Sequence, residues 1–378
     1  MAAVPKGHQR GTHRMVAPAT TLARIRPHLA SFGITRCADI TGLDCIGIPV
    51  YVAVRPQGRI LQTSNGKGLT EVDAQVSALM EAIEHWHAEH PVAPLRRACR
   101  AELTAERRPV LSPRGLEGGP IKGRVDRLAL DWVEGVELVS GEPAWIPAYV
   151  AAYHRDQPFA FSYNGLASGN HPVEATLHAL YEVIERDSLA RLSARGQVRL
   201  ERCGVIDLDE ADGLGDEVGG LVERIRRADL QLVLLHVPTA GDVHTLMAVL
   251  LDPSAFSGAS MVNFGTGAHL SPTVAAIRAI TEAAQSRLTF IHGSREDLTE
   301  RAYTRGANHE AMLGYFSALS PDTPWSALAD RASDGLHADL ARVLSTIPCA
   351  YAADLGQGKA GVSAMKVIVP GAKLADWI

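Results

Sequence analysis

Apolar residues recur at helical spacing in several long stretches of the chain. In the first of these, Val72, Val76, Leu79 and Ile83 fall on one stripe, the pattern of an amphipathic helix. The pattern predicts long helices over residues 71–89, 172–195 and 272–288. Each of these helices follows a segment rich in small residues, and we predict loops there, over residues 64–68, 159–170 and 263–269.

Shorter runs that are rich in Val, Ile, Leu and Ala predict strands. Two further helices are predicted, one over residues 20–30, ended by Gly33, and one near 326–345. No long low-complexity linker interrupts these elements, which favours one large α+β unit in which β-sheets pack with long helices. The predicted strands cover residues 46–55, 127–133, 136–138, 230–237, 245–251, 350–354 and 364–369.

The three long predicted helices also resemble one another in sequence. They carry the segments ALMEAIE, ALYEVIE and AITEAAQ, and their first glutamates are Glu81, Glu182 and Glu282, at offsets of 101 and 100 residues. An internal pseudo-repeat would explain this spacing. The alternative is chance, because Ala, Leu and Glu are common in all helices.

The recurrent glutamates are candidates for a binding site. On a helix, Glu81 and Glu84 are three residues apart and share a face, as do Glu182 and Glu185. Such carboxylates usually lie on a solvated face, but these are flanked by apolar residues, so we expect the helices to be largely buried. Carboxylates that converge in a partly buried pocket cost several kcal/mol per ion unless they are protonated or neutralised.

A hard divalent cation with a phosphate substrate would supply that neutralisation. Mg²⁺ prefers oxygen ligands and usually binds together with a phosphate. Arg186 follows Glu185 directly and Arg278 precedes Glu282 by four residues, so both arginines could clamp the phosphate. Each arginine could instead form an ordinary ion pair. We therefore predict a Mg²⁺–nucleotide site between the helices.

Other sequence motifs for nucleotides and metals are incomplete. The segment at 64–68 lacks the glycine spacing and the Ser or Thr of a P-loop, and Gly265-Thr266-Gly267 lacks the third glycine of a dinucleotide fingerprint. The five cysteines form no C-x-x-C pair, which argues against a disulfide framework and a thiolate zinc site. Such cysteines are typical of a reducing cytoplasm.

Composition and charge narrow the classes of function. Of 378 residues, 46% are hydrophobic and 21% charged, the balance of a soluble globular protein. The 37 Lys and Arg against 42 Asp and Glu give a net charge of −5, which argues against a nucleic-acid partner. No uncharged apolar run is long enough for a membrane span, and the basic N-terminus lacks the apolar core of a secretory signal. We therefore expect a cytoplasmic protein.

Taken together, the motifs resemble those of the YcaO family, whose members are ATP- and Mg²⁺-dependent enzymes that activate a peptide backbone amide. Each motif alone is weak, but the resemblance extends from residue 10 to residue 371. The matching segments are Arg10–Arg14, Ser64–Gly68, Ser77–Glu84, Asn170–Ala175, Glu182–Asp187, Gly265–His269, Arg278–Arg287 and Arg295–Asp297.

The resemblance implies a YcaO-like fold and roles for individual residues. A Lys is usual in the family at the position of Arg10 and a Ser at that of Ala17, which cannot donate a hydrogen bond. No protein nucleophile is implied, so no residue is assigned a catalytic role. The implied Mg²⁺ ligands, direct or through water, are Glu81, Glu84, Glu182 and Glu185. The implied nucleotide and phosphate contacts are Arg10, Arg14, Lys67, Ser77, Asn170, Glu174, Arg186, Arg278 and Glu282.

The resemblance also implies a function and partners. Segments such as RGTHR and SNGKGLTEVDA resemble most the subgroup that acts beside a TfuA-type partner and is linked to backbone thioamides. The implied function is thioamide formation in a ribosomally made peptide or protein. The alternatives are a cyclodehydratase that forms azolines from Cys, Ser or Thr, and a non-catalytic module that binds a leader peptide or a partner. The implied partners are the substrate peptide and a TfuA-like protein, and homodimerisation stays open.

The division of the chain follows from the same resemblance. Residues 1–60 would form the N-terminal segment of the fold, residues 61–300 the core with the nucleotide site, and residues 301–378 the C-terminal part of the same domain.

Overall fold

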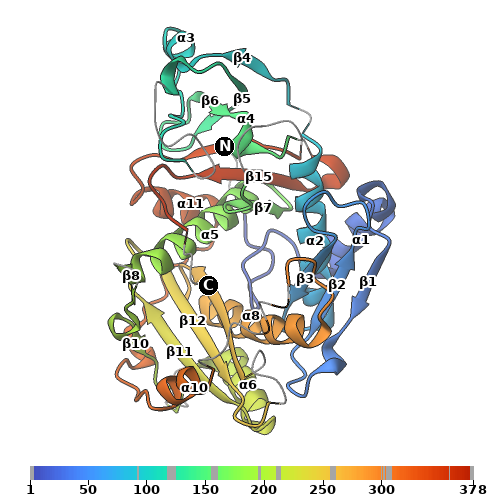
Figure 1. Cartoon of the computed structure of the whole chain (residues 1–378), viewed down its shortest axis with the longest axis vertical. Coiled ribbons are helices and arrows are strands. Elements are labelled where there is room, and N and C mark those ends of the chain that lie inside the picture. The colour runs from blue at the N-terminus through green and yellow to red at the C-terminus, as the bar shows by residue number, and fades with distance from the viewer. Residues whose placement is uncertain are drawn as a thin grey trace.

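The computed structural model has an α+β architecture in which long helices pack on antiparallel sheets (Figure 1). It describes residues 4–91, 93–116, 125–154, 161–194, 197–209, 214–255, 261–298, 300, 303, 309–356 and 358–374. None of the helices in these ranges has the length and apolar composition needed to cross a membrane.

The α-helices are α1 (Pro18–Ile25), α2 (Glu71–Glu89), α3 (Arg100–Thr104), α4 (Ala148–Ala151), α5 (Pro172–Leu192), α6 (Gly215–Arg227), α8 (Pro272–His292), α10 (His309–Ser317) and α11 (Leu336–Leu344). Short 3-10 helices are η1 (Arg26–Phe32), η2 (Thr41–Leu43), η3 (Val125–Arg127), η4 (Leu200–Arg202), η5 (Trp325–Ala327) and η6 (Lys359–Gly361).

The strands form four antiparallel sheets within the described ranges. The first sheet has the order β1 (Arg36–Asp39), β2 (Val50–Val54), β3 (Thr63–Lys67). The second has the order β10 (Gly204–Val205), β11 (Gln231–Val237), β12 (His244–Leu251), β13 (Val262–His269). The third has the order β4 (Arg96–Ala98), β5 (Leu130–Glu137), β14 (Tyr351–Asp354), β15 (Ser363–Ile368), β7 (Leu166–Gly169), with β6 (Pro143–Pro147) also on β5. The fourth pairs β8 (Ser193–Ala194) with β9 (Gln197–Val198).

The predicted helices are confirmed, with shifted ends in most cases. The first long helix occupies residues 71–89 as predicted, whereas α8 continues to His292, where Gly293 takes a left-handed conformation. The helix predicted over 20–30 is divided between α1 and η1, and the one predicted near 326–345 is shorter, as α11. Two of the predicted strands, 127–133 and 136–138, are one strand, β5, because its pairing with β6 continues across the predicted break.

The loop predictions were wrong where β3, β7 and β13 form, whereas residues 161–165 are a loop as predicted; residues 159 and 160 lie outside the described residues. The glycines there serve close packing rather than turns. A Cβ on Gly66 would lie 2.0 Å from the Ala78 backbone nitrogen, and one on Gly267 would lie 2.8 Å from that of Ala279. Each strand therefore packs directly on the helix that follows it, which only glycine permits at these positions.

These contacts confirm the internal pseudo-repeat. Gly66 and Gly267 each face the nitrogen of the residue twelve positions later and the carbonyl oxygen of the residue eight positions later. Gly68 and Gly169 each face residues five and six positions later. The glycines of each pair are separated by 201 and 101 residues in the sequence, as are the corresponding glutamates of the helices. The three segments are thus copies of one strand–helix unit.

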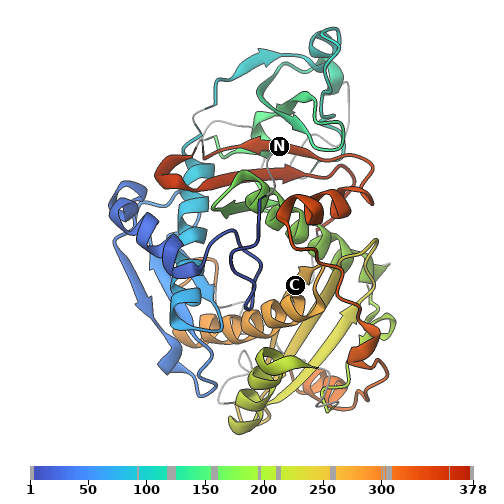
Figure 2. The ribbon, with the colours of Figure 1, turned by 180° about the vertical axis from the view of Figure 1, so that it is seen from behind.

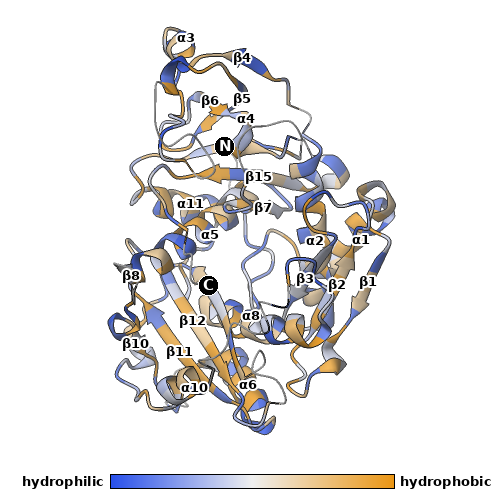
Figure 3. Cartoon of the chain, viewed as in Figure 1, coloured by the Kyte–Doolittle hydropathy of each residue, from blue (hydrophilic) through white to orange (hydrophobic). Residues whose placement is uncertain are grey.

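The three units close into a ring. β3 packs against α2 and α8, β7 against α5 and α2, and β13 against α8 and α5. Each strand therefore contacts the helix of its own unit and the helix of the preceding unit. In Figure 1 the three long helices form the sides of a triangle. Outside the triangle, β11 and β12 form an apolar layer, seen as orange in Figure 3, that packs with α6, α8 and α10.

Gly66→Ala should destabilise the protein strongly, because the added Cβ would overlap the backbone of α2 and force the strand away. Gly220→Ala on α6 is the matched control, since nothing lies within 4 Å of its Cβ position. Alanine is favoured over glycine in a helix by about 0.5–1 kcal/mol, so the control should be slightly stabilised. The denaturant midpoint measures both effects, and a Gly66→Ala midpoint equal to that of the wild type would contradict the close packing.

Candidate functional site

The glutamates of the three long helices converge at the centre of the ring. Glu81 and Glu84 of α2 lie within electrostatic reach of Glu182 of α5, and Glu185 of α5 lies within reach of Glu282 of α8. The side chain of Glu185 is only 5% exposed, and that of Glu282 is 26% exposed. The structure thus brings together the carboxylates that the sequence pattern singled out.

Burial and mutual repulsion make most of these carboxylates hard to ionise. Burial raises the pKa of Glu81 to about 7, although the nearby Lys67 ammonium acts to lower it. Burial likewise raises the pKa of Glu182 to about 7. Burial and the nearby Glu182 hold the pKa of Glu84 well above its ordinary value. Burial and Glu282 also raise the pKa of Glu185.

Basic side chains offset part of this negative charge. Lys67 of β3 forms an ion pair with Glu282, with 2.5 Å between Nζ and Oε2. Burial alone would raise the pKa of Glu282, but Lys67 and Arg186 outweigh it and lower that pKa to about 2. Arg186 Nε lies 3.8 Å from Glu185 Oε1. The Lys67–Glu282 pair joins β3 to α8, whereas Arg186 and Glu185 are neighbours on α5.

Two arginines at the site retain unused donors. The Nε atoms of Arg186 and Arg278 are buried and have no hydrogen-bond partner among the residues that the structure describes. A buried guanidinium donor without an acceptor is costly. A phosphate group would satisfy both donors, because arginine forks match phosphate oxygens. The site therefore fits the phosphates of a nucleotide.

The carboxylates fit Mg²⁺ in its usual form of binding. Within the described ranges, no three His, Cys, Asp or Glu side chains are gathered closely enough to hold a metal ion by themselves. Mg²⁺ seldom uses an all-protein cage and is usually held by one or two carboxylates, several waters and substrate phosphates. Carboxylates on separate helices lie next to arginines whose Nε atoms have no hydrogen-bond partner within the described ranges. This arrangement suits a metal that enters together with a phosphate.

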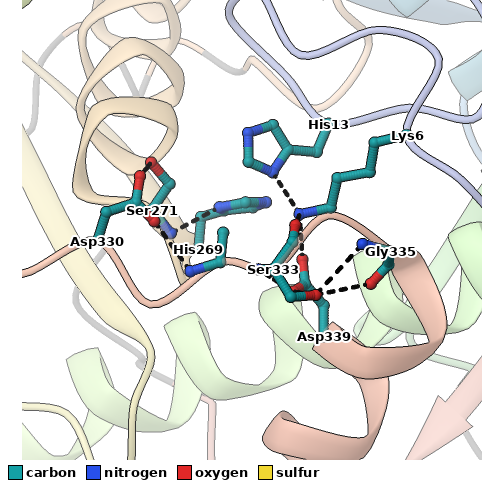
Figure 4. Close-up of polar contacts among 9 residues, drawn as sticks. Lys6, His13, His269, Ser271, Asp330, Ser333, Gly335 and Asp339 are labelled. Carbon is teal, nitrogen blue, oxygen red and sulfur yellow. Dashed lines mark hydrogen bonds and ion pairs between the residues drawn. The ribbon is translucent and has the colours of Figure 1, made fainter.

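An N-terminal strap, residues 4–16, enters the triangle of helices. Figure 2 shows it in dark blue between the orange α8 and the light blue α2. Lys6 anchors the strap through a fully buried ion pair with Asp339 of α11, at 2.6 Å. Lys6 Nζ also donates to the carbonyl of Ser333 and contacts Nδ1 of His13 at 3.0 Å (Figure 4). Burial and the Lys6 ammonium lower the pKa of His13 to about 4, so its neutral ring accepts this hydrogen bond.

The strap carries Arg14 to a cavity between α5 and α8. Arg14, His178, His269 and Arg278 all line this cavity. Arg14 Nη1 lies 3.5 Å from Oε1 of Glu174, which also accepts a hydrogen bond from the Met15 backbone at 2.7 Å through its other oxygen. Both ends of the strap are therefore fastened, and its Arg14 lies in the same cavity as Arg278.

The remaining candidates are Asn170, Ser77 and Arg10, of which Arg10 belongs to the strap itself. Asn170 donates to Glu174 through its backbone and side chain, and accepts from Thr21 of α1 at 3.0 Å. Ser77 lies half-buried on α2, one turn before Glu81. Arg10 is 68% exposed and pairs with Glu217 of α6 at 3.5 Å. The structure thus places Asn170 beside Glu174, which holds the strap, but leaves Arg10 at the surface.

Sequence reasoning missed several residues that connect the site. Thr266 of β13 contacts both Glu185 and Glu282, Ser168 of β7 contacts Glu84, and Asp339 holds Lys6. The first two lie in segments predicted as loops, so their orientation could not be derived. Had those segments been recognised as strands, the alternation of side chains would have pointed to Thr266. No local signal pairs Lys6 with Asp339, which lies far away in the sequence.

Glu182→Gln should stabilise the metal-free protein at high pH. A carboxyl whose pKa rises from 4.5 to about 7 on folding binds more protons when folded, so stability falls as pH rises between those values. The variant should lose stability less steeply over that range and melt a few degrees higher at pH 8 in EDTA. Glu223→Gln, at an exposed pair on α6, is the control and should leave the slope unchanged. Equal slopes for the wild type and Glu182→Gln would contradict the burial of this charge.

Comparison with known proteins identifies the family to which the chain belongs. Residues 65–373 match the family model described as YcaO cyclodehydratase, ATP- and Mg²⁺-binding. An uncharacterized protein of Mycobacterium tuberculosis is 37% identical over 98% of this chain and 84% of its own length. An uncharacterized protein encoded in the tfuA 3' region of Rhizobium leguminosarum bv. trifolii is 38% identical over 79% of this chain and 72% of its own length.

Solved structures share the fold. The YcaO protein of Methanopyrus kandleri, bound with AMPPCP and Mg²⁺, has a TM-score of 0.77 and 22% identity, and the match covers 98% of this chain and 95% of that one. A heterocyclase in complex with substrate and cofactor has a TM-score of 0.79 and 22% identity over 99% of this chain and 54% of its own. The resemblance inferred from the motifs is confirmed, and the chain belongs to the YcaO family of ATP- and Mg²⁺-binding proteins.

Proposed function

We propose that this protein uses ATP and Mg²⁺ to activate a backbone amide of a peptide, which then becomes a thioamide. The observation that carries the proposal is the convergence of glutamates from three helices beside two arginines whose buried Nε atoms have no hydrogen-bond partner among the described residues. Phosphoryl transfer requires this kind of arrangement, because positioning and charge neutralisation supply most of its catalysis.

The side chains of the ring would have three roles: binding the metal, binding the phosphates and holding the strap. Mg²⁺, when bound, would neutralise charge on the phosphates. Asn170 and Glu174 would hold the strap that carries Arg14, as their hydrogen bonds indicate. Ser77 and Arg10 are retained as further nucleotide contacts. The proposed metal ligands are Glu81, Glu84, Glu182 and Glu185. The proposed phosphate contacts are Arg14, Lys67, Arg186 and Arg278, with Glu282 orienting Lys67.

The proposed reaction exchanges the amide oxygen for sulfur. The amide oxygen attacks the γ-phosphorus of ATP, and ADP leaves. Hydrosulfide then adds to the electrophilic amide carbon, phosphate leaves with the original oxygen, and the sulfur-bound proton passes to solvent. The fixed cations of the ring would stabilise charge on the transferred group. No protein nucleophile is needed, so the five cysteines are not assigned a role in the reaction.

Thioamide formation is favoured over ring closure by one relative. The protein from Rhizobium leguminosarum is encoded in the tfuA 3' region. This location supports a TfuA-like partner for this chain as well. We propose that the reaction takes place in the cytoplasm with these two partners, the substrate peptide and the TfuA-like protein.

A cyclodehydratase is the second candidate, because the family model bears that description and one solved relative is a heterocyclase with its substrate. In that case a Cys, Ser or Thr side chain of the peptide attacks the activated carbon. A non-catalytic binding module is the third candidate. The converging glutamates disfavour it, since binding a peptide does not require carboxylates with raised pKa values.

High-resolution mass spectrometry of the cognate peptide separates the candidates. After incubation with enzyme, ATP, Mg²⁺, sulfide and a TfuA-like partner, we expect sulfur in place of one oxygen, with the near-ultraviolet absorbance of a thioamide. Glu84→Gln should give no product, because one carboxylate of the proposed metal site is lost. Glu223→Gln is the matched control and should leave product formation unchanged. Loss of water without sulfur would contradict thioamidation and support the cyclodehydratase.

A further inference from the structure

The Gly265-Thr266-Gly267 motif on β13 has two different faces. A Cβ on Gly265 would lie 2.1 Å from the Ala283 nitrogen, and one on Gly267 would lie 2.3 Å from the Ala275 oxygen, both on α8. Successive side chains of a strand point to opposite faces. Thr266 therefore lies between two glycines that pack closely on α8. Its own side chain points away from the face on which these glycines pack.

That side chain reaches the carboxylates of two helices. Thr266 Oγ1 lies 2.7 Å from Glu185 Oε1 and 3.1 Å from Glu282 Oε1, and the Thr266 backbone N–H donates to the same Glu282 atom at 3.3 Å. Thr266 is 3% exposed and Glu185 is 4% exposed. A hydroxyl has one proton to donate, and the shorter contact assigns it to Glu185, whereas the backbone N–H serves Glu282.

The two carboxylates beside Thr266 have different counter-charges. Glu282 is paired with the Lys67 ammonium at 2.5 Å, which neutralises it. Glu185 receives a neutral hydroxyl donor at 2.7 Å and a more distant Arg186 at 3.8 Å. A neutral donor fixes the orientation of a carboxylate without cancelling its charge, so the other oxygen of Glu185 keeps its attraction for a cation.

A related arrangement is found elsewhere in the ring. Ser168 of β7 lies close to Glu84 of α2, and its hydroxyl donates to the Met80 carbonyl of the same helix at 3.3 Å. Glu84 and Glu185 are the second glutamates of their units, at the pseudo-repeat offset of 101 residues. A hydroxyl side chain from the following strand thus lies beside the second glutamate in two units, and at Glu185 it donates its proton to the carboxylate.

We infer that Thr266 is a positioning residue that orients the Glu185 carboxylate toward Mg²⁺ through a hydrogen bond across the boundary between two units of the ring. This inference rests on the proposed function, because it assumes that Glu185 binds the metal. Hydrogen-bonding partners behind a metal ligand typically contribute 10–100-fold to metal affinity, although they do not touch the metal.

Titration calorimetry of Mg²⁺ into the full chain, with saturating AMPPCP present, tests the inference. Thr266→Val has nearly the same shape but no hydroxyl, and it should weaken Mg²⁺ binding about 10–100-fold. Thr266→Ser keeps the donor and should restore the wild-type affinity, which a packing role would not explain. The matched control is Thr245→Val on β12, whose buried hydroxyl has no hydrogen-bond partner within the described ranges and whose loss should leave Mg²⁺ affinity unchanged.

A second variant keeps the test decisive if Thr266→Val does not fold. Thr266→Ala also removes the donor to Glu185, without the second methyl group that valine brings, and should weaken Mg²⁺ binding in the same way. Wild-type affinity in both Thr266→Val and Thr266→Ala would overturn the inference and leave the proposed function intact. Absence of Mg²⁺ binding by the wild type would overturn the proposed function, and this inference with it.

Discussion

Burial of neighbouring carboxylates on α2, α5 and α8, with the repulsion between them, is the constraint on which the rest of the structure depends. Three helices that each bring glutamates to one place are held together only if cations or protons offset the charge. Lys67 and Arg186 supply part of that compensation from within the ring. Burial still raises the pKa of Glu81 and of Glu182 to about 7, so these cations offset only part of the cost of ionising the two carboxylates. The site is thus prepared for a cation that arrives with a phosphate.

The pseudo-repeat explains how one chain assembles such a site. A strand–helix unit cannot surround a ligand by itself, whereas three copies in a ring place equivalent glutamates around one centre. Glycines at equivalent positions set the distance between strand and helix, and polar side chains of each strand reach the preceding helix. The N-terminal strap then adds Arg14, fixed by the buried Lys6–Asp339 pair and by Glu174.

The sequence was sufficient to predict the long helices, their glutamates and the family, because these depend on local periodicity and on spacing. It failed at the three segments before the helices, where Gly66 and Gly267 were interpreted as loop glycines. Glycine in a strand that packs on a helix and glycine in a turn look alike in one sequence, since only the partner element distinguishes them. For the same reason, contacts such as Lys6 with Asp339 and Thr266 with Glu185 required the tertiary structure.

The central claim is that the ring binds a nucleotide and Mg²⁺ as one unit. Mg²⁺ would neutralise the glutamates, and the phosphates of the nucleotide would neutralise the arginines. Calorimetric titration of AMPPCP into the wild-type protein, in Mg²⁺ and separately in EDTA, tests this most directly. The account predicts binding that is tighter by about tenfold or more with Mg²⁺, equivalent to about 1.4 kcal/mol or more. Equal affinities in the two buffers, or no binding in either, would contradict it.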